Sequence, residues 1–365
     1  MLLREGRRMR WFLGFLLVIA LVAGALYAVG RFLLPNQLEV ARSIQVERPR
    51  ASVFAMINDL NIAKEWSPYY ARDPNAQFTI SPAPGEGQRM RWASNVREVG
   101  SGSMSIVRSV ENEAVESLLQ IGDRATLNSR IDLQRGENVT NVNWAISAEC
   151  AEGWINVPCR YMNLIIRSTI EKDIDSGLAR LKGRAEQLPA QDFEGYDIVE
   201  VLVQPQDVMF VDVTLSNPAP TFEDRDRAER QGVQALMNSI ASAGGQADTA
   251  TLIRVFPQDN GIGGRFRFSV GHPYSGPAPV LIGSRVGQTP GGAALRATVV
   301  GRRSQVPLMY QRLEAFRQAH RIGLRPGAEA WEIATPTPQP DGADPNDPVE
   351  RTEIFYPIEV ARERS

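Results

Sequence analysis

The chain has 365 residues, of which 43% are hydrophobic and 22% are charged, and both shares are ordinary for a globular protein. Its formal net charge is -2, which excludes the basic surplus typical of nucleic-acid-binding proteins, so we expect no nucleic-acid partner. At about 100–200 residues per domain, this length predicts two domains beyond any membrane segment.

The N-terminal region carries an uncharged apolar run from Trp11 to Gly30. A helix needs about 20 such residues to cross the roughly 30 Å hydrocarbon layer of a bilayer, so the run predicts a transmembrane helix. Arginines cluster just before it, at Arg4, Arg7, Arg8 and Arg10. Because positive residues stay on the cytoplasmic side, we expect residues 1–35 to form a cytoplasmic N-terminus and a single-pass anchor in the inner (cytoplasmic) membrane, with a periplasmic or extracellular body. A cleaved signal peptide ending near Ala23-Gly24-Ala25 is the alternative interpretation.

The chain contains two cysteines, Cys150 and Cys159. On the exported side such a pair can form a disulfide, and two buried free thiols are the alternative. A metal site is disfavoured, because the only histidines are His272 and His320 and neither has ligand spacing to the cysteines. We expect no metal ion and no cofactor.

Residues 37–188 have the pattern of one α+β domain. Apolar and polar residues alternate over 38–46, which predicts a strand with one buried face. A short helix is expected after Pro49, where proline suits a helix start. Further strand-like runs, separated by turn residues, predict an antiparallel meander at 78–80, 88–93, 102–110, 114–120, 125–133 and 140–146. The stretch 161–187 has one apolar stripe and should form a long helix across this sheet.

The first domain resembles the START-related SRPBCC superfamily, also labelled polyketide cyclase/dehydrase-like. The resemblance rests on Leu38-Glu39-Val40-Ala41-Arg42-Ser43-Ile44, Pro49-Arg50-Ala51-Ser52-Val53-Phe54, Asp59-Leu60 and Glu65-Trp66-Ser67-Pro68. It implies a helix-grip fold, in which a curved sheet and a long helix enclose an apolar cavity for lipids or other hydrophobic molecules. Candidate lining residues are Trp66, Trp92, Met104 and Trp144, and ordinary core positions are the alternative. No catalytic residue is implied, because the superfamily shares a cavity rather than a set of reacting groups.

After a linker at 189–195 the pattern restarts, and residues 196–360 show a weak internal duplication. Strands are expected at 198–203, 208–215, 249–256, 265–271, 280–286, 293–301, 330–333 and 351–357. Helices are expected at 222–243, with Thr221 as the N-cap, and at 306–322. The order strand, helix, strand, strand therefore occurs twice. Two such units side by side leave a cleft along their pseudo-twofold axis, which is a frequent ligand site.

The second domain resembles the GyrI-like effector-binding family, the small-molecule-sensing module of several multidrug-responsive regulators. The matching segments are Pro290-Gly291-Gly292-Ala293-Ala294, the helix ending near His320, Trp331-Glu332 and Thr352-Glu353-Ile354-Phe355-Tyr356-Pro357-Ile358. The resemblance implies an aromatic pocket in which Glu332 faces cationic or amphipathic drugs, with Trp331 and Phe355 beside it. Ala334 and Phe355 stand where tyrosines are frequent in the family, which makes the expected cleft less polar.

These patterns support three functional hypotheses. The favoured one is a membrane-anchored binding protein for hydrophobic or amphipathic small molecules, with two cavity domains on the exported side. The second is a hydrolase that uses Glu332 as a general base, because burial within apolar walls raises the pKa of a carboxylate. The third is a structural partner in an envelope complex. The sequence names no protein partner and no catalytic residue.

Overall fold

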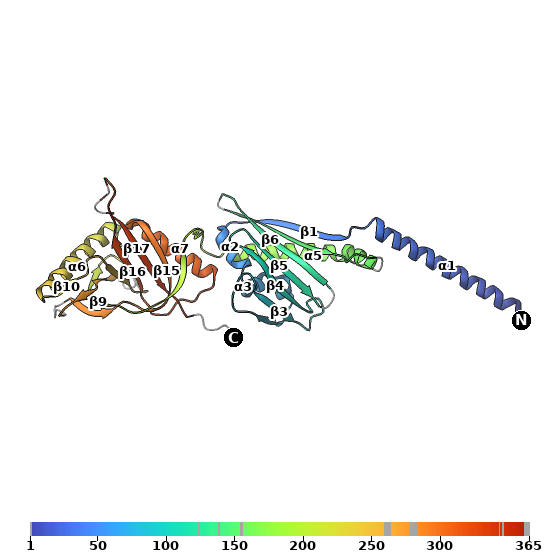
Figure 1. Ribbon diagram of the computed structural model, residues 1–365, viewed down its shortest axis with the longest axis horizontal. Helices are drawn as coiled ribbons and strands as arrows, with labels where there is room; N and C mark the ends of the chain where they lie inside the picture. The colour runs from blue at the N-terminus through green and yellow to red at the C-terminus, as the bar shows by residue number, and fades with distance from the viewer. Residues whose placement is uncertain are drawn as a thin grey trace. The chain divides into compact units, whose positions relative to one another are not determined.

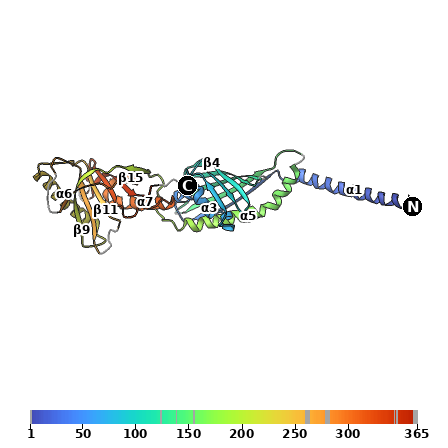
Figure 2. The same ribbon diagram turned by 90° about the horizontal axis from the view of Figure 1, so that it is seen from below.

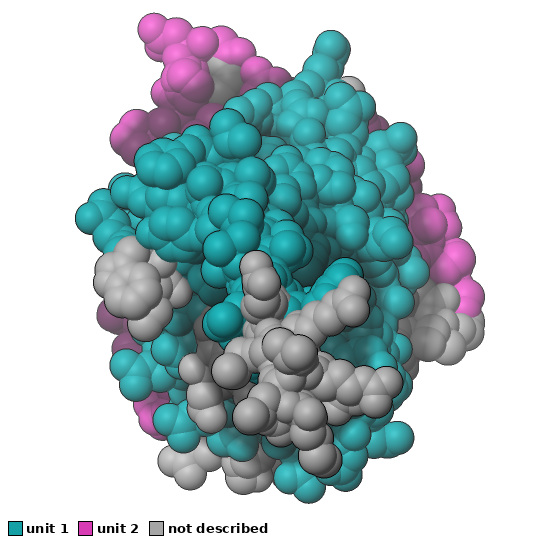
Figure 3. Space-filling model, turned by 90° about the vertical axis from the view of Figure 1, so that its right-hand side faces the viewer, with its two compact units in different colours: residues 1–187 teal, residues 188–365 magenta. Residues whose placement is uncertain are grey.

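The computed structural model describes residues 2–122, 125–137, 139–153, 156–258, 264–277, 283–342, 344 and 347–360. The chain divides into two compact units, residues 1–187 and 188–365, which Figure 3 shows in different colours. Each unit combines helices with a large antiparallel sheet, which confirms the α+β class. The side chains of Arg4, Arg7, Arg8 and Arg10 lie outside the described set.

The first element is a long helix, α1 (Leu2–Phe32), which Figure 1 shows extending away from the strands of its unit. Its segment Trp11–Phe32 is long and apolar enough to cross a membrane, and a signal sequence meets the same two criteria. From Trp11 onward every residue of the helix is exposed except Gly30, which is buried. The helix therefore presents an apolar surface on all sides rather than one buried stripe.

The first unit contains a seven-stranded antiparallel sheet in the order β1-β7-β6-β5-β4-β3-β2. Its strands are β1 (Gln37–Val46), β2 (Gln77–Ile80), β3 (Arg89–Ala93), β4 (Ser101–Val110), β5 (Ala114–Ile121), β6 (Ala125–Arg135) and β7 (Thr140–Glu149). Six consecutive strands are neighbours, as the sequence pattern predicts, and the first strand returns to pair with the last.

Three short helices connect β1 to β2, namely α2 (Arg50–Ile57), α3 (Leu60–Trp66) and α4 (Pro68–Arg72). The side chain of Asp59 accepts a hydrogen bond from the backbone N–H of Asn61 and so caps α3. Ser67 caps α4 in the same way, with a proline as the first helical residue. The long helix α5 (Val157–Ala185) lies along the sheet (Figures 1 and 2) and buries Ile174, Leu178 and Leu181. This is the helix-grip order of elements.

The second unit contains an eight-stranded antiparallel sheet in the order β14-β9-β12-β11-β16-β17-β15-β8, and a two-stranded sheet. The eight strands are β8 (Ile198–Val203), β9 (Asp207–Leu215), β11 (Leu252–Phe256), β12 (Phe266–His272), β14 (Ser284–Gln288), β15 (Gly292–Arg302), β16 (Ala330–Pro336) and β17 (Val349–Pro357). The small sheet pairs β10 (Gln246–Ala247) with β13 (Tyr274–Ser275). The strand expected at 280–286 lies partly outside the described residues, and its described part belongs to β14.

The strand order of the large sheet is symmetric about its centre. The segment β9, α6 (Phe222–Ser242), β11, β12 contributes three adjacent strands. The segment β15, η2 (Arg303–Gln305), α7 (Val306–Ala319), β16, β17 contributes the other three, and the two triplets meet where β11 pairs with β16. The sequence order strand, helix, strand, strand is therefore present twice. Thr221 caps α6 by accepting from the N–H of Asp224, as predicted.

The two faces of this sheet are buried in different ways. Apolar clusters cover one face under α6 and α7, with Met209 against α6 and Leu295 against α7. The opposite face carries a separate core cluster of Val208, Phe210, Ile253, Val255, Ala294, Trp331 and Phe355. Because neighbouring residues of a strand point to opposite faces, β9, β15 and β17 contribute to clusters on both faces.

Candidate functional site

A cavity of about 290 Å³ lies between α6, α7 and the sheet of the second unit. This volume is close to the lower end of the roughly 300–1,000 Å³ range of small-molecule sites. Four rings form a continuous wall, with centroid separations of 5.9 Å from Phe266 to Phe268, 6.0 Å from Phe268 to Phe256 and 6.5 Å from Phe256 to Tyr310. The remaining lining residues are Phe222, Arg225, Asp226, Glu229, Arg254, Arg303, Val306, Pro307 and Glu332.

Charged side chains make up the floor of the cavity. The guanidinium of Arg254 on β11, which is 2% exposed, donates to Glu350 at 2.9 Å, to Glu229 at 3.0 Å and to Glu332 at 3.2 Å. Burial by itself would lower the pKa of Arg254, but these three carboxylates raise it well above its ordinary value. Removing a charge from water is costly, so a cation in this position requires such partners.

A second arginine completes the arrangement. Arg303 of η2 donates to Asp226 at 2.7 Å and also contacts Glu229, so α6, η2 and three strands contribute to one network. We call Arg254, Arg303, Asp226, Glu229, Glu332 and Glu350 the ion cluster. Within it, burial raises the pKa of Asp226, against the opposing attraction of Arg303.

The structure places Glu332 at the cavity, where the sequence led us to expect it, but as a member of an ion pair. β16 aligns Glu332 directly opposite Arg254 of β11. Burial raises the pKa of Glu332, and the positive charges of Arg254 and Arg303 oppose this rise. The carboxylate therefore does not present an unbalanced negative charge to the cavity.

The expectation that Trp331 and Phe355 line the same cavity is corrected by the structure. Both belong to the core cluster on the opposite face of the sheet, at 0% and 6% exposure. Their rings stack at a centroid distance of 4.9 Å, because the two residues are directly paired between β16 and β17. Strand alternation turns Trp331 away from the face to which its neighbour Glu332 points.

Two further polar groups lie at the cavity. The hydroxyl of Tyr310 on α7 is buried, and burial, the charge of Glu332 and a side-chain hydrogen bond to Glu332 raise the pKa of Tyr310 well above its ordinary value. The Nε of Arg225 on α6 is buried without a hydrogen-bond partner among the described residues. Its guanidinium lies 6.0 Å from the ring centroid of Phe222 and 5.8 Å from that of Phe266.

The sequence pattern did not indicate that Tyr310 or the arginines Arg225, Arg254 and Arg303 lie at this cavity. One signal was available for Arg254, which lies in the otherwise apolar strand Leu252–Phe256. A charge in the middle of such a strand is costly unless it is paired, and so indicates a buried partner. No comparable signal marks Arg225, because charged residues surround it in the first turns of α6.

The first unit contains a much smaller cavity of about 60 Å³. All four residues proposed from the sequence, Trp66, Trp92, Met104 and Trp144, line it. This volume is well below the roughly 300–1,000 Å³ of small-molecule sites. The structure therefore brings the predicted residues together but around a space that is nearly filled.

The tryptophan side chains of this small cavity are held tightly. Trp144 donates to Ser129 at 2.9 Å and Trp66 donates to the carbonyl of Met56 at 3.1 Å. A Cβ added at Gly177 would lie 2.5 Å from the ring of Trp144, and one at Gly102 would lie 2.3 Å from the ring of Trp92. Glycine at these positions allows the indoles to pack directly against the backbone.

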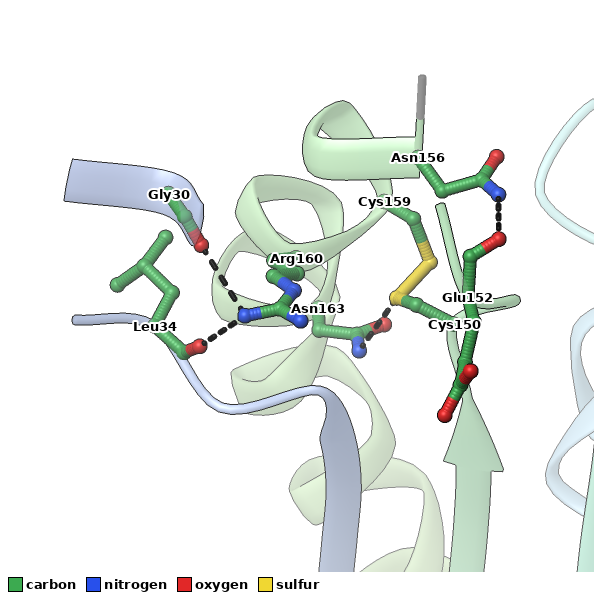
Figure 4. The surroundings of a disulfide bond; sticks show 8 residues. All are labelled: Gly30, Leu34, Cys150, Glu152, Asn156, Cys159, Arg160 and Asn163. Carbon is green, nitrogen blue, oxygen red and sulfur yellow. Dashed lines mark hydrogen bonds between the residues drawn. A yellow bond between two sulfur atoms is a disulfide. The ribbon is translucent and has the colours of Figure 1, made fainter. Parts of the chain in front are cut away.

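A disulfide joins Cys150, just after β7, to Cys159 in the first turn of α5 (Figure 4). The next residue, Arg160, donates to the carbonyl oxygens of Arg31 at 2.8 Å and Leu34 at 2.9 Å. Gly30 packs against α5 so closely that an added Cβ would lie 2.4 Å from Val157. The disulfide therefore fixes the part of α5 that holds the end of α1.

Among the described residues, no group of three or more His, Cys, Asp or Glu side chains is arranged to hold a metal ion. The four carboxylates of the ion cluster are instead paired with arginines.

Comparison with known proteins gives structural matches only. No family model and no curated protein sequence matches the chain. Among solved structures, it is similar to a START superfamily protein from Mycobacterium smegmatis, with 16% identity and a TM-score of 0.30, over 41% of this chain and 97% of that one. It is also similar to the Aha1 dimer from Colwellia psychrerythraea, with 16% identity and a TM-score of 0.30, over 40% of this chain and 96% of that one. The protein TTHA0849 from Thermus thermophilus matches with 13% identity and a TM-score of 0.31, over 40% and 96% of the two chains.

Proposed function

We propose that the protein is a membrane-anchored binding protein for amphipathic small molecules, and that the second-unit cavity is its binding site. The observation that carries this proposal is the combination, in one cavity of about 290 Å³, of a four-ring aromatic wall and a charged floor. Apolar walls with a few convergent polar groups are typical of small-molecule sites.

The organisation of the chain supports the same proposal. The symmetric strand order of the second unit fits a GyrI-like effector-binding domain over residues 196–360. The helix-grip order of the first unit fits a START-like domain over residues 37–188. Trp11 to Gly30 would anchor both in the inner membrane with the N-terminus inside. We place ligand binding in the second unit, because the first-unit cavity of about 60 Å³ is well below the roughly 300–1,000 Å³ of small-molecule sites.

The test is mass spectrometry of the small molecules that co-purify with the full chain, compared between two variants on α7. Val306→Phe adds bulk to a residue that lines the cavity, whereas Leu308→Phe adds bulk to a residue that is 38% exposed and does not line it. We expect a bound molecule in the unmutated protein and in Leu308→Phe, and its loss in Val306→Phe. Thermal unfolding of each variant reports whether it is folded. Equal occupancy in two folded variants would refute the proposed site.

A hydrolase is the second candidate, because burial raises the pKa of Glu332 and a raised pKa suits a general base. The ion pair with Arg254 at 3.2 Å argues against it, since the carboxylate is already engaged. Turnover of small electrophilic or ester substrates that disappears in Glu332→Gln would establish the enzyme. Binding without turnover in the unmutated chain would exclude it for those substrates.

A further inference from the structure

The ion cluster forms its hydrogen bonds and ion pairs without Arg225. Arg254 and Arg303 contact its four carboxylates, and Arg230 additionally contacts Asp226 from the surface side of α6. Each of the four carboxylates therefore has an arginine within ion-pair distance without Arg225.

Arg225 is the remaining charge on the cavity wall. It makes no hydrogen bond or ion pair with a described residue, and its Nε is shielded from water. The rings of Phe222 and Phe266 are its nearest aromatic neighbours, which leaves the donor edge of the guanidinium without an acceptor. The buried Nε has lost hydration without gaining a hydrogen-bond partner, which is an unfavourable state that a bound acceptor would relieve.

We propose that the cavity selects an amphipathic ligand whose polar end is an organic anion, held by Arg225 while its apolar body lies along the aromatic wall. The inference rests on the proposed function of this cavity and assigns its ligand class. Arginine suits this role because its planar donors match the two oxygens of a carboxylate or sulfonate. The aromatic wall begins at Phe266, next to Arg225, and continues to Tyr310, so one ligand can satisfy both features.

This assignment reverses the charge preference that the position of Glu332 alone suggests. A cationic ligand would have to compete with Arg254 for Glu332, and would lie beside the guanidinium of Arg225. An anionic ligand would instead meet a guanidinium that makes no ion pair with a described residue.

The test uses three probes that share one ring system: naphthalene-2-carboxylate, its neutral amide and the cation 2-naphthylmethylammonium. Binding to the full chain in lipid nanodiscs is measured by titration calorimetry at neutral pH, with empty nanodiscs as the blank. We expect the carboxylate to bind at least about tenfold more tightly than the amide, as for a charge-assisted hydrogen bond, and the cation to bind most weakly.

Variants of α6 assign the preference to Arg225. Arg225→Gln should reduce carboxylate affinity to that of the amide and leave amide affinity unchanged, and Arg225→Lys should retain part of the preference. The matched control is Arg227→Gln, because this side chain is 65% exposed and does not line the cavity. Equal affinities for the three probes, tightest binding of the cation, or a carboxylate preference that survives Arg225→Gln would overturn the anion assignment while the binding function stands. Failure of all three probes to bind would overturn the proposed function as well.

Discussion

At the scale of single residues, the second unit concentrates its charge where the two halves of its sheet meet. Arg254 and Glu332 are direct partners across the central strand pair, so each half contributes one member of the ion pair. A buried arginine of this kind stabilises the fold only while its carboxylates are in place. The ion cluster therefore ties the two halves together and also determines the charge at the cavity floor.

Two glutamates of the cluster should respond to pH in opposite directions. Burial raises the pKa of Glu332 above its ordinary value of 4.5. Its contribution to the free energy of unfolding is therefore complete below pH 4.5 and is lost as the pH rises through the raised value. We expect Glu332→Gln to gain stability relative to the unmutated protein as the pH rises above 4.5, measured by thermal unfolding in detergent.

Glu350 provides the matched control. Burial alone would raise the pKa of Glu350, but the charge and hydrogen bond of Arg254 bring it below 4.5. Its contribution is present above pH 4.5 and is lost as the pH falls through the lowered value, so Glu350→Gln should lose stability relative to the unmutated protein as the pH rises. A common direction for the two variants would contradict the cluster as described.

The sequence could place Glu332 at a cavity but could not give its surroundings. The Trp331-Glu332 pair was visible, whereas the face on which each residue lies depends on strand alternation relative to a core that the sequence does not locate. Trp331 was accordingly placed in the cavity although it belongs to the opposite core. The sequence could not single out Arg225, because the proposal depends on its having no hydrogen-bond partner among the residues that the structure describes.

At the scale of elements, periodicity predicted most helices and strands with small shifts at their ends. The largest correction in the first unit concerns α5, which begins at Val157 rather than at residue 161. Hydrophobic periodicity carries no information on this first turn, because contacts with the end of α1 and the disulfide hold it in place. The three short helices before β2 were likewise only partly predicted, because each is too short to show a period.

The disulfide gives a prediction at this scale. Non-reducing peptide mapping of protein taken from its native compartment should give Cys150 and Cys159 in one cross-linked peptide. For a closed loop of about ten residues, a double alanine variant should lose about 2–3 kcal/mol in the free energy of unfolding. Hydrogen exchange should increase mainly in the first turns of α5, whose connection to β7 is lost. Free alkylation of both cysteines in the unreduced protein would disprove the link.

At the scale of the whole molecule, the arginine cluster before Trp11 predicts the orientation of the chain. Alkaline phosphatase, which requires an oxidising compartment, should be active when fused after Ser365 and inactive when fused at the N-terminus. A reporter that works only in the cytoplasm should show the reverse pattern. Activity of that reporter at the C-terminal position would overturn the assigned topology.

The joint between α1 and α5 restricts the orientation of the first unit relative to α1. Only four residues separate α1 from β1, and Arg160 and Gly30 hold this connection against α5. If α1 spans a bilayer as proposed, this joint would restrict rotation of the first unit about the end of the helix. The first unit would then lose less orientational entropy when it binds a partner at the membrane, because the joint already restricts its orientation. Substitution of Gly30 by a larger residue would restore that freedom and slow productive encounters.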